Sequence, residues 1–395
     1  LEMLMAGSVI SKYWGVYLND FMRLMGWNAN TNLTFGSFHI DIAPIIIVAF
    51  FTTLLVFGTK IGARVDGAMT VLKIAIVFFV VIVGFFYVKA SNFTPFIPPS
   101  QPASTVEGSS AVTGVMTQPL WQFATGMTPS VYGVPGILSG AALVFFAFIG
   151  FDVVATASEE TKNPHKNVPL GIGVGMLLII VMYMLVAVVT TGMVSYADLA
   201  KQDSPSLATA FELVGADWAA KIISFGIVLG LATVVMVLLL GLTRIVFAMS
   251  RDGLLPRGLS KTGKHGTPAA LQIVVGAVVA LVAAFFDIGV LSDMVNIGTL
   301  SAFTLVAISI PIMRKKRPDL PRAFKMPGSP WIPILIAVAN FWLMLNLSVL
   351  TWIRFVVWLV VGFAIYFGYG YWHARLGKGD LTETLSAETD KAVNG

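Results

Sequence analysis

Cysteine is absent from this 395-residue sequence, which excludes disulfide bonds, a thiolate nucleophile and a cysteine-ligated metal site. Charged residues are also scarce, because they make up 11% of the chain whereas soluble domains average about 25%. So few charged side chains cannot cover the surface of a water-soluble protein of this length. The composition therefore predicts a protein that folds in a membrane.

Catalytic signatures are missing as well. The four histidines (His39, His165, His265 and His373) fall in loops or at the ends of apolar runs, which excludes a haem pair or a histidine relay inside the membrane. The sequence has no HExxH, phosphate-loop or GxSxG pattern. An intramembrane enzyme is therefore the least favoured class, and we expect no cofactor and no metal.

Hydrophobic residues make up 57% of the chain, and they concentrate in ten runs of the roughly 20 residues that a helix needs to cross a bilayer. The runs are continuous rather than alternating, which favours helices over a β-barrel. We expect an all-α polytopic membrane protein with about ten spans. They lie near residues 3–25, 42–59, 67–88, 136–157, 170–194, 219–242, 269–286, 290–313, 330–350 and 353–372.

Lys and Arg are distributed unevenly between alternate loops. Of the 25 basic residues, 18 fall in one set of alternate loops, five fall in the other set, and Lys12 and Lys73 lie within runs. This asymmetry is the positive-inside pattern, so the basic residues indicate topology here and not nucleic-acid binding. Both ends of the chain are expected in the cytoplasm, with the protein in a bacterial-type plasma membrane.

The polar segments complete this organisation. Residues 90–134 are rich in Pro, Ser, Thr and Gly and predict an external loop, with a short apolar segment near residues 120–123. The chain starts at Leu1 inside an apolar run, without the features of a signal peptide, which we interpret as a missing preceding segment. The residues after Gly377 predict a polar, mobile tail.

Lys73 lies about six residues into the third run. A lysine at the centre of a span costs about 2.5–3.5 kcal/mol on insertion scales, so it must face protein, water or a partner. Three interpretations remain open. Lys73 snorkels to the cytoplasmic interface, it is a fixed cation on a substrate or ion pathway, or, as a remote alternative, it forms a retinal Schiff base.

The fourth run contains the segment FFAFIGFD at residues 145–152, in which a glycine and an acid lie close together among aromatic residues. Ordinary packing would explain it, since glycine is common in transmembrane helices. The alternative is an unwound helix near Ile149 and Gly150, whose freed carbonyls hold a substrate ammonium. Asp152 is then a proton or substrate contact, or a residue at the helix end that meets cytoplasmic water.

Other ionisable residues near the runs have simpler interpretations. Lys12, in the outer half of the first run, is expected to reach the surface. Asp287 and Asp293 flank a tight external turn and are expected to be solvated. Glu2 lies at the start of the chain, where the sequence does not define its depth.

Three stretches of the sequence resemble the amino acid–polyamine–organocation superfamily, most closely its cationic amino-acid transporter branch. The first stretch continues FFAFIGFD into the loop SEETKNPHKNVP at residues 158–169. The second is LTRIVFAMSRDGLLP at 242–256, and the third runs from NIGTLSAFT at 296–304 to RPDLPR at 317–322. The resemblance covers nearly the whole chain outside residues 95–134 and the tail.

The resemblance implies the leucine-transporter fold, in which two inverted five-helix repeats are followed by two accessory helices. It makes the run containing Phe148 the sixth helix of the family and the first run its third, so ten of twelve helices are expected here. The implied parts are three helices of the first repeat at 1–89, the external loop at 90–134, the second repeat at 135–313, two accessory helices at 314–377 and the tail at 378–395.

The resemblance also implies roles for residues. Carbonyls near Phe145, Ala147 and Phe148 would receive the substrate ammonium, and Phe148 would form part of a gate. Lys73 matches a lysine that replaces a sodium ion in sodium-independent members, Glu2 matches an acidic position of the cationic branch, and Met236 would line the side-chain pocket. The full expected substrate-binding set is Phe145, Ala147, Phe148, Ile149, Gly150, Asp152, Met236 and Glu2.

We therefore expect a sodium-independent secondary transporter that moves cationic or small neutral amino acids by proton-linked uptake or exchange. Its expected partners are an amino-acid substrate, the lipid bilayer and a coupling proton. A non-transporting membrane receptor or scaffold on the same fold is the alternative, because the polar external loop could bind a partner.

Overall fold

The computed structural model describes residues 2–27, 31–35, 38–57, 62–105, 114–151, 161, 163–202, 205–261, 267–318, 326 and 328–374. Ten helical segments match the ten predicted runs. They are α1 (Glu2–Leu24), α2 (Ile42–Phe57), α3 (Gly62–Phe85), α5 (Gly133–Val144) with the 3-10 turn η4 (Phe145–Phe148), α7 (Pro164–Met193), α10 (Asp217–Arg251), α11 (Ala269–Phe285), α12 (Ile288–Lys316), α13 (Trp331–Leu345) and α14 (Val349–Ile365). The predicted all-α architecture is confirmed.

Two of these helices extend further than the apolar pattern predicts. Helix α10 continues past the end of the predicted run, through Arg244 to Arg251, because a helix can project its polar last turns beyond the lipid. Helix α7 begins at Pro164, since proline is well suited to the first helical turn, where its missing N–H is not needed.

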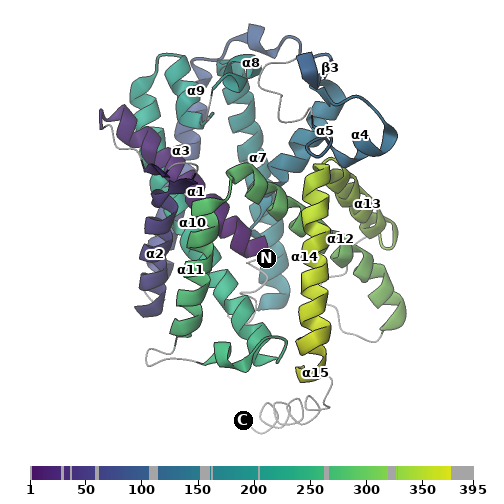
Figure 1. The fold of residues 1–395 in the computed structure, drawn as a ribbon. Helices are drawn as coiled ribbons and strands as arrows, with labels where there is room; N and C mark the ends of the chain where they lie inside the picture. The colour runs from purple at the N-terminus through teal and green to yellow at the C-terminus, as the bar shows by residue number, and fades with distance from the viewer. Residues whose placement is uncertain are drawn as a thin grey trace.

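Short elements cap the two ends of the bundle. In Figure 1, α8, α9 and β3 lie at one end and α15 at the other. The predicted apolar segment of the external loop forms α4 (Leu120–Thr125). The remaining short elements are β1 (Asn32–Phe35), β2 (Phe38–Asp41), η1 (Ala90–Phe93), β3 (Gln101–Pro102), η2 (Ala103–Thr105), β4 (Ser130–Val131), α8 (Tyr196–Ala200), α9 (Leu207–Leu213), η6 (Arg257–Ser260), η7 (Tyr366–Gly370) and α15 (Tyr371–His373).

Most of the long helices have the length or composition of membrane spans. Five helical segments within the described residues are long and apolar enough to cross a bilayer, namely Gly67–Phe85, Lys166–Met193, Asp217–Arg251, Ile288–Lys316 and Val349–His373. Four shorter apolar helices accompany them, within α2, α5 with η4, α11 and α13. Helix α1 has 23 residues, which is long enough for a span, but its charged side chains keep it out of both groups. It packs on α10 and crosses it obliquely (Figure 1).

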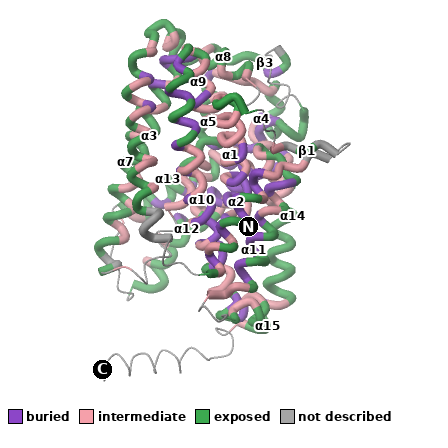
Figure 2. Tube along the Cα trace, turned by 90° about the vertical axis from the view of Figure 1, so that its left-hand side faces the viewer, coloured by how far each residue is buried: buried purple, intermediate pink, exposed green. Residues whose placement is uncertain are grey.

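The buried core lies where α1, α2, α10 and α11 meet. Figure 2 shows buried residues concentrated in this region, whereas the outer helices α7 and α14 are largely exposed. Small residues allow close approach, because a Cβ on Gly15 would lie 2.9 Å from the Cβ of Ala43. Close packing through glycine is how membrane helices gain van der Waals contact where lipid supplies no hydrophobic driving force.

The contacts between helices show an internal symmetry. If α1 is exchanged with α10, α2 with α11 and α3 with α12, the same pairs of helices are in contact. Helix α1 packs on α10, and α2 packs on α11. The contact of α1 with α12 corresponds to that of α10 with α3, and the contact of α1 with α11 to that of α10 with α2. Helix α1 is the first span and α10 is the sixth in chain order. Because consecutive spans alternate in direction, the two triplets cross in opposite directions, as an inverted repeat requires.

The loop before α5 is bound to the turn between α13 and α14. The backbone N–H of Leu120 donates to the carbonyl of Leu347 at 3.0 Å, and that of Val349 donates to Gln118 at 3.1 Å. The rings of Trp121 and Trp342 stack with centroids 6.4 Å apart. This part of the predicted external loop therefore connects the interrupted helix to the accessory helices.

Candidate functional site

Of the two interpretations of the fourth span, the interrupted helix is the one that the structure has. Helix α5 tightens into η4 and ends at Ile149, whose backbone is extended at φ −68° and ψ 139°. Gly150 follows at φ +119°, a conformation that residues with a Cβ rarely adopt. The Ile149 N–H donates to the Phe146 carbonyl at 3.1 Å and closes this turn. The chain therefore leaves the helix within an apolar span.

Side chains from two other helices bond to carbonyls around this interruption. The Asn296 amide on α12 donates to the Leu143 carbonyl at 3.2 Å, and the Tyr183 hydroxyl on α7 donates to the Ala147 carbonyl at 2.6 Å. Carbonyls that a helix no longer pairs need such donors inside a bilayer, because no water reaches them there. Neither donor was assigned a role from the sequence, since hydroxyls and amides in spans occur without a distinguishing pattern.

Aromatic rings surround the interruption. The rings of Phe148 and Tyr183 meet edge to face at 5.1 Å, so Phe148 packs against α7. Phe145 and Phe151 both contact Phe303 of α12, with centroids 6.1 and 5.2 Å apart. The aromatic residues that the sequence grouped in one segment thus bind η4 to α7 on one side and to α12 on the other.

An apolar cluster covers a further side of the interruption. Phe146 and Ile149 pack against the buried cluster of Ala6, Val9, Leu238, Leu291 and Val295. These residues come from α1, α10 and α12. The interruption therefore lies beside aliphatic side chains on this face.

Lys73 faces protein rather than lipid. It is half-buried on α3, and its aliphatic stem packs over Gly230 of α10, where an added Cβ would lie 3.2 Å from the lysine Cγ. Glycine at this position leaves room for the stem. The role of Lys73 as a fixed cation on a substrate or ion pathway stays a prediction.

Glu2 lines a separate cavity of about 790 Å³ between α1, α10, α12 and α14. A Cβ on Gly298 would lie 3.8 Å from the Cβ of Glu2, so α1 and α12 meet closely here. The lining includes Met249 and Met294 but no residue of 145–150. Glu2 lies one helical turn before Ala6, which belongs to the cluster beside the interruption. The acid and the interrupted helix are thus neighbours without sharing this cavity.

Two other expected site residues add little to the geometry. Met236 is 6% exposed and packs with Met3 and Leu239 in the core of α1, α2, α10 and α11. It lines neither the cavity beside Glu2 nor a second one at the ends of α3 and α7. Asp152 lies outside the described residues.

Two expectations for charged residues were wrong. Lys12 does not reach the surface, because its side chain is 12% exposed, lies 3.7 Å from Asp41 and donates to the Ala283 carbonyl at 3.0 Å. Asp293 is not simply solvated, since it accepts a hydrogen bond from Thr351 of α14 at 3.0 Å. Burial near lipid makes such partners necessary. Asp287 is exposed as expected and caps α12 through the Gly289 N–H.

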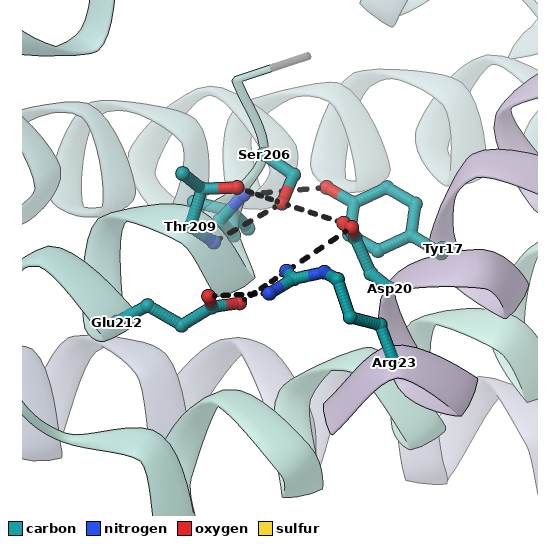
Figure 3. Close-up of polar contacts among 7 residues, drawn as sticks. Tyr17, Asp20, Arg23, Ser206, Thr209 and Glu212 are labelled. Carbon is teal, nitrogen blue, oxygen red and sulfur yellow. Dashed lines mark hydrogen bonds and ion pairs between the residues drawn. The ribbon is translucent and has the colours of Figure 1, made fainter. Parts of the chain in front are cut away.

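A polar network closes the end of α1 against α9 (Figure 3). Both terminal nitrogens of Arg23 bond to Glu212, at 2.8 and 3.0 Å. The Ser206 hydroxyl donates to Asp20 at 3.1 Å, and the Leu207 N–H donates to the Tyr17 hydroxyl at 3.4 Å. These contacts hold the end of α1 at residues 17–23 against residues 206–212, which are far away in the sequence.

Known proteins resemble this chain over almost all of its length. It is 39% identical over 386 residues to the branched-chain amino acid permease BcaP of Bacillus subtilis (strain 168), which covers 96% of this chain and 76% of that protein. It is 36% identical over 384 residues to the methylthioribose transporter of the same bacterium, with the same coverage of both chains. It is 34% identical to the vacuolar cationic amino acid transporter 4 of Arabidopsis thaliana, over 71% of this chain and 42% of that one.

These relatives are named as permeases or transporters and not as enzymes, which agrees with the absence of catalytic motifs. The resemblance to the amino acid–polyamine–organocation superfamily is confirmed. Residues 4–370 match the amino acid permease family, and the chain belongs to that family of integral membrane proteins.

Proposed function

We propose that this protein is a sodium-independent secondary transporter of neutral aliphatic amino acids, which works by alternating access. The observation that carries the proposal is the interrupted span at Phe145–Gly150. An unbroken helix has no backbone groups to offer a substrate, whereas an interruption deep in the bilayer exposes carbonyls and helix ends. The membrane-spanning composition and the permease family set the context for this site.

The chemistry of a zwitterion fits such a site. Neither charge crosses hydrocarbon unless it is matched, and helix ends match both charges without buried counter-ions. In our proposal the ammonium group binds carbonyls near Phe145, Ala147 and Phe148. The Ala147 carbonyl already accepts from Tyr183, and a carbonyl oxygen has two lone pairs, so one position remains for the substrate.

The aliphatic surroundings favour a neutral side chain. Phe146 and Ile149 pack among Val9, Leu238 and Val295, which offer no charge to a basic substrate. The relative with 39% identity is named as a branched-chain amino acid permease, in agreement with this preference. The relative named as a methylthioribose transporter means that family membership alone does not define the substrate.

A cationic substrate is the second candidate, and Glu2 is the observation that favours it. This carboxylate lies near the same cluster, one turn before Ala6, and lines a cavity with Met249 and Met294. A basic side chain reaching past the aliphatic cluster would find its counter-charge there. In that case Glu2→Gln abolishes arginine uptake and leaves alanine uptake in place.

For coupling, we propose that Lys73 supplies the positive charge that a sodium ion would otherwise provide. Its stem lies against Gly230, where α3 packs on α10. In the symmetric contact pattern, this contact is the counterpart of the one between α1 and α12. Transport then needs no sodium, and a proton gradient or exchange drives it. Phe148 and Tyr183, in edge-to-face contact, form the gate at η4.

The test is uptake by the full-length protein reconstituted in liposomes. Labelled leucine, alanine, arginine and methylthioribose are each offered with and without a pH gradient, in sodium and in potassium buffers. We expect leucine uptake or exchange that is independent of sodium. Phe148→Ala lowers the apparent affinity or raises leak, whereas Phe285→Ala, at an exposed position at the end of α11 that lines neither cavity, leaves both unchanged.

Absence of flux for every amino acid in a folded sample would overturn the proposal. Thermal stabilisation by leucine without any flux would instead favour the receptor or scaffold interpretation. Uptake of methylthioribose alone would keep a transporter but overturn the assignment of its substrate.

A further inference from the structure

A second cavity, of about 510 Å³, lies where two spans end together. It is lined by residues that directly follow the apolar span Gly67–Phe85 and by those at the end of the span Lys166–Met193. Where two spans stop side by side, the surrounding medium changes from hydrocarbon to headgroups and water. The cavity therefore lies at the depth of lipid headgroups.

Its walls are held in place by backbone contacts between the two segments. The Lys89 N–H and the Asn92 amide both donate to the Gly192 carbonyl, at 2.9 and 2.7 Å. Gly192 has no room for a side chain, because a Cβ there would lie 2.7 Å from the ring of Phe93. The cavity is thus preformed and does not depend on a ligand to bring its walls together.

The lining combines opposite charges with apolar surface. Lys89 and Asp198 are both exposed at the cavity, and Met193 and Val194 form a buried apolar part of its wall. Asp198 accepts from the Ser195 hydroxyl at 2.7 Å and from Lys201 at 3.3 Å, and these contacts lower the pKa of its carboxyl. It is therefore ionised at neutral pH. A ligand that has an anionic and a cationic group matches this pair.

A lipid-facing stripe leads to the same cavity. Phe78, Ile82, Phe85 and Phe86 are all exposed, with Phe86 at 81%. On a helix, positions spaced by three or four residues share one face, so the first three of these side chains form a continuous apolar track along α3. Acyl chains can lie along that track, whereas a free amino acid would make no use of it.

From this arrangement we propose that the cavity between the ends of α3 and α7 binds the headgroup of a zwitterionic phospholipid, one with a primary ammonium and a phosphate. The phosphate binds Lys89, the ammonium binds Asp198, and the acyl chains follow the stripe of α3. This binding does not require the transport site at η4, and it remains if the proposed substrate is wrong.

The experiment measures lipid retained by the purified full-length protein in native mass spectrometry. Dioleoyl phosphatidylethanolamine, phosphatidylglycerol and phosphatidylcholine are added separately. We expect preferential retention of phosphatidylethanolamine, because phosphatidylglycerol has no cation and the quaternary ammonium of phosphatidylcholine has no N–H donor. Lys89→Gln and Asp198→Asn should each reduce that retention about tenfold, which corresponds to about 1.4 kcal/mol. Asp198→Asn should also remove the discrimination against phosphatidylglycerol.

Matched controls are Lys221→Gln and Asp217→Asn, which neutralise exposed charges at the start of α10 that do not line the cavity. Both should retain phosphatidylethanolamine as the parent protein does. Equal retention of the three lipids, or unchanged retention in Lys89→Gln and Asp198→Asn, would overturn the proposal. Thermal stabilisation by soluble phosphoethanolamine or glycine equal to that by the lipid would assign the cavity to a free zwitterion and would also overturn it.

Discussion

Tyr183 and Lys73 are polar residues on otherwise apolar helices, and each is directed at a neighbouring helix. Tyr183 donates a hydrogen bond to the Ala147 carbonyl and packs against Phe148. Lys73 lies against Gly230. In hydrocarbon, a polar group is tolerated where it has protein or water around it, so its direction is informative about function.

At the residue scale, Tyr183→Phe removes the hydrogen bond to Ala147 and keeps the ring against Phe148. We expect kcat/KM for leucine to fall about three- to tenfold, because a neutral hydrogen bond contributes about 0.5–1.5 kcal/mol. Uptake kinetics in liposomes measure the effect. Tyr371→Phe, on an exposed ring at the far end of the chain, is the control and should behave as the parent protein. Unchanged kinetics in Tyr183→Phe would mean that this bond does not support the site.

The second residue-scale prediction concerns Lys73. Lys73→Ala should slow uptake about tenfold, as expected for the loss of about 1.4 kcal/mol of coupling, while the unfolding temperature changes little. Gly230→Leu should have a similar effect because it displaces the lysine stem, whereas Gly230→Ala should be mild, since a flexible stem can move by a few tenths of an ångström. Uptake that responds to pH as in the parent protein would show that Lys73 has no part in coupling.

At the element scale, one segment combines a regular helix with an interruption. Helix α5 is ordinary up to Val144, then η4 tightens and Gly150 turns the chain at φ +119°. Contacts from α7 and α12 satisfy the carbonyls that the regular pattern no longer serves. An interruption in lipid therefore depends on its neighbours as much as on its own residues.

Gly150→Ala tests this element. An alanine at that φ costs about 1–3 kcal/mol, so we expect a lower unfolding temperature or an altered interruption with loss of uptake. Gly140→Ala is the matched control, because Gly140 is helical with open space around its Cβ position, and alanine should be neutral or stabilising there. Thermal unfolding in detergent and leucine uptake give the two readouts. Equal behaviour of the two variants would contradict a special conformation at Gly150.

At the scale of the whole molecule, contacts at the bundle ends join segments that are far apart in sequence. The Arg23–Glu212 pair and its neighbours fasten α1 to α9 (Figure 3). The backbone bonds of Leu120 and Val349 join the loop before α5 to the turn before α14. These contacts hold the helices together at their ends and involve no residue of η4.

The ion pair at the end of α1 should contribute modestly. Arg23 is 56% exposed, so the coupling free energy between Arg23→Gln and Glu212→Gln in a double-mutant cycle should be about 0.2–1 kcal/mol. Thermal unfolding at low and high salt measures it, and the coupling should shrink as salt screens the pair. Arg257→Gln, in η6 at the other end, should not couple to Glu212. A coupling that salt does not reduce would contradict this description.

The absence of cysteine allows a direct test of orientation, because any introduced thiol is unique. Lys201→Cys, beside α8, should react with a membrane-impermeant maleimide added outside intact cells. Lys261→Cys, after η6, should react only once the membrane is opened. The expectation follows from the concentration of Lys and Arg in the loops on the η6 side. The reverse labelling pattern would invert the proposed topology.

Much of this molecule could be predicted from the order of its residues. The ten spans follow from continuous apolar runs, since lipid admits backbone only where its hydrogen bonds are satisfied within the segment. The interruption near Gly150 was one of two interpretations of its span, and a short apolar segment near residues 120–123 was predicted where α4 lies, because glycine among aromatic residues and a short apolar stretch in a polar loop are local signals. The ends of α7 and α10 were less accurate, since polar turns continue a helix beyond the lipid.

The partners across helices were decided only by the tertiary structure. Lys12 with Asp41, Asp293 with Thr351, and Tyr183 with Ala147 each join residues whose pairing has no local pattern. A hydrophobic run in the sequence predicts that a residue lies in a span, but it does not predict which neighbouring helix the side chain faces. That choice depends on how the spans cross. The sequence by itself therefore determined a ten-span membrane protein with one broken helix, and the packing of those helices decided which groups surround the break.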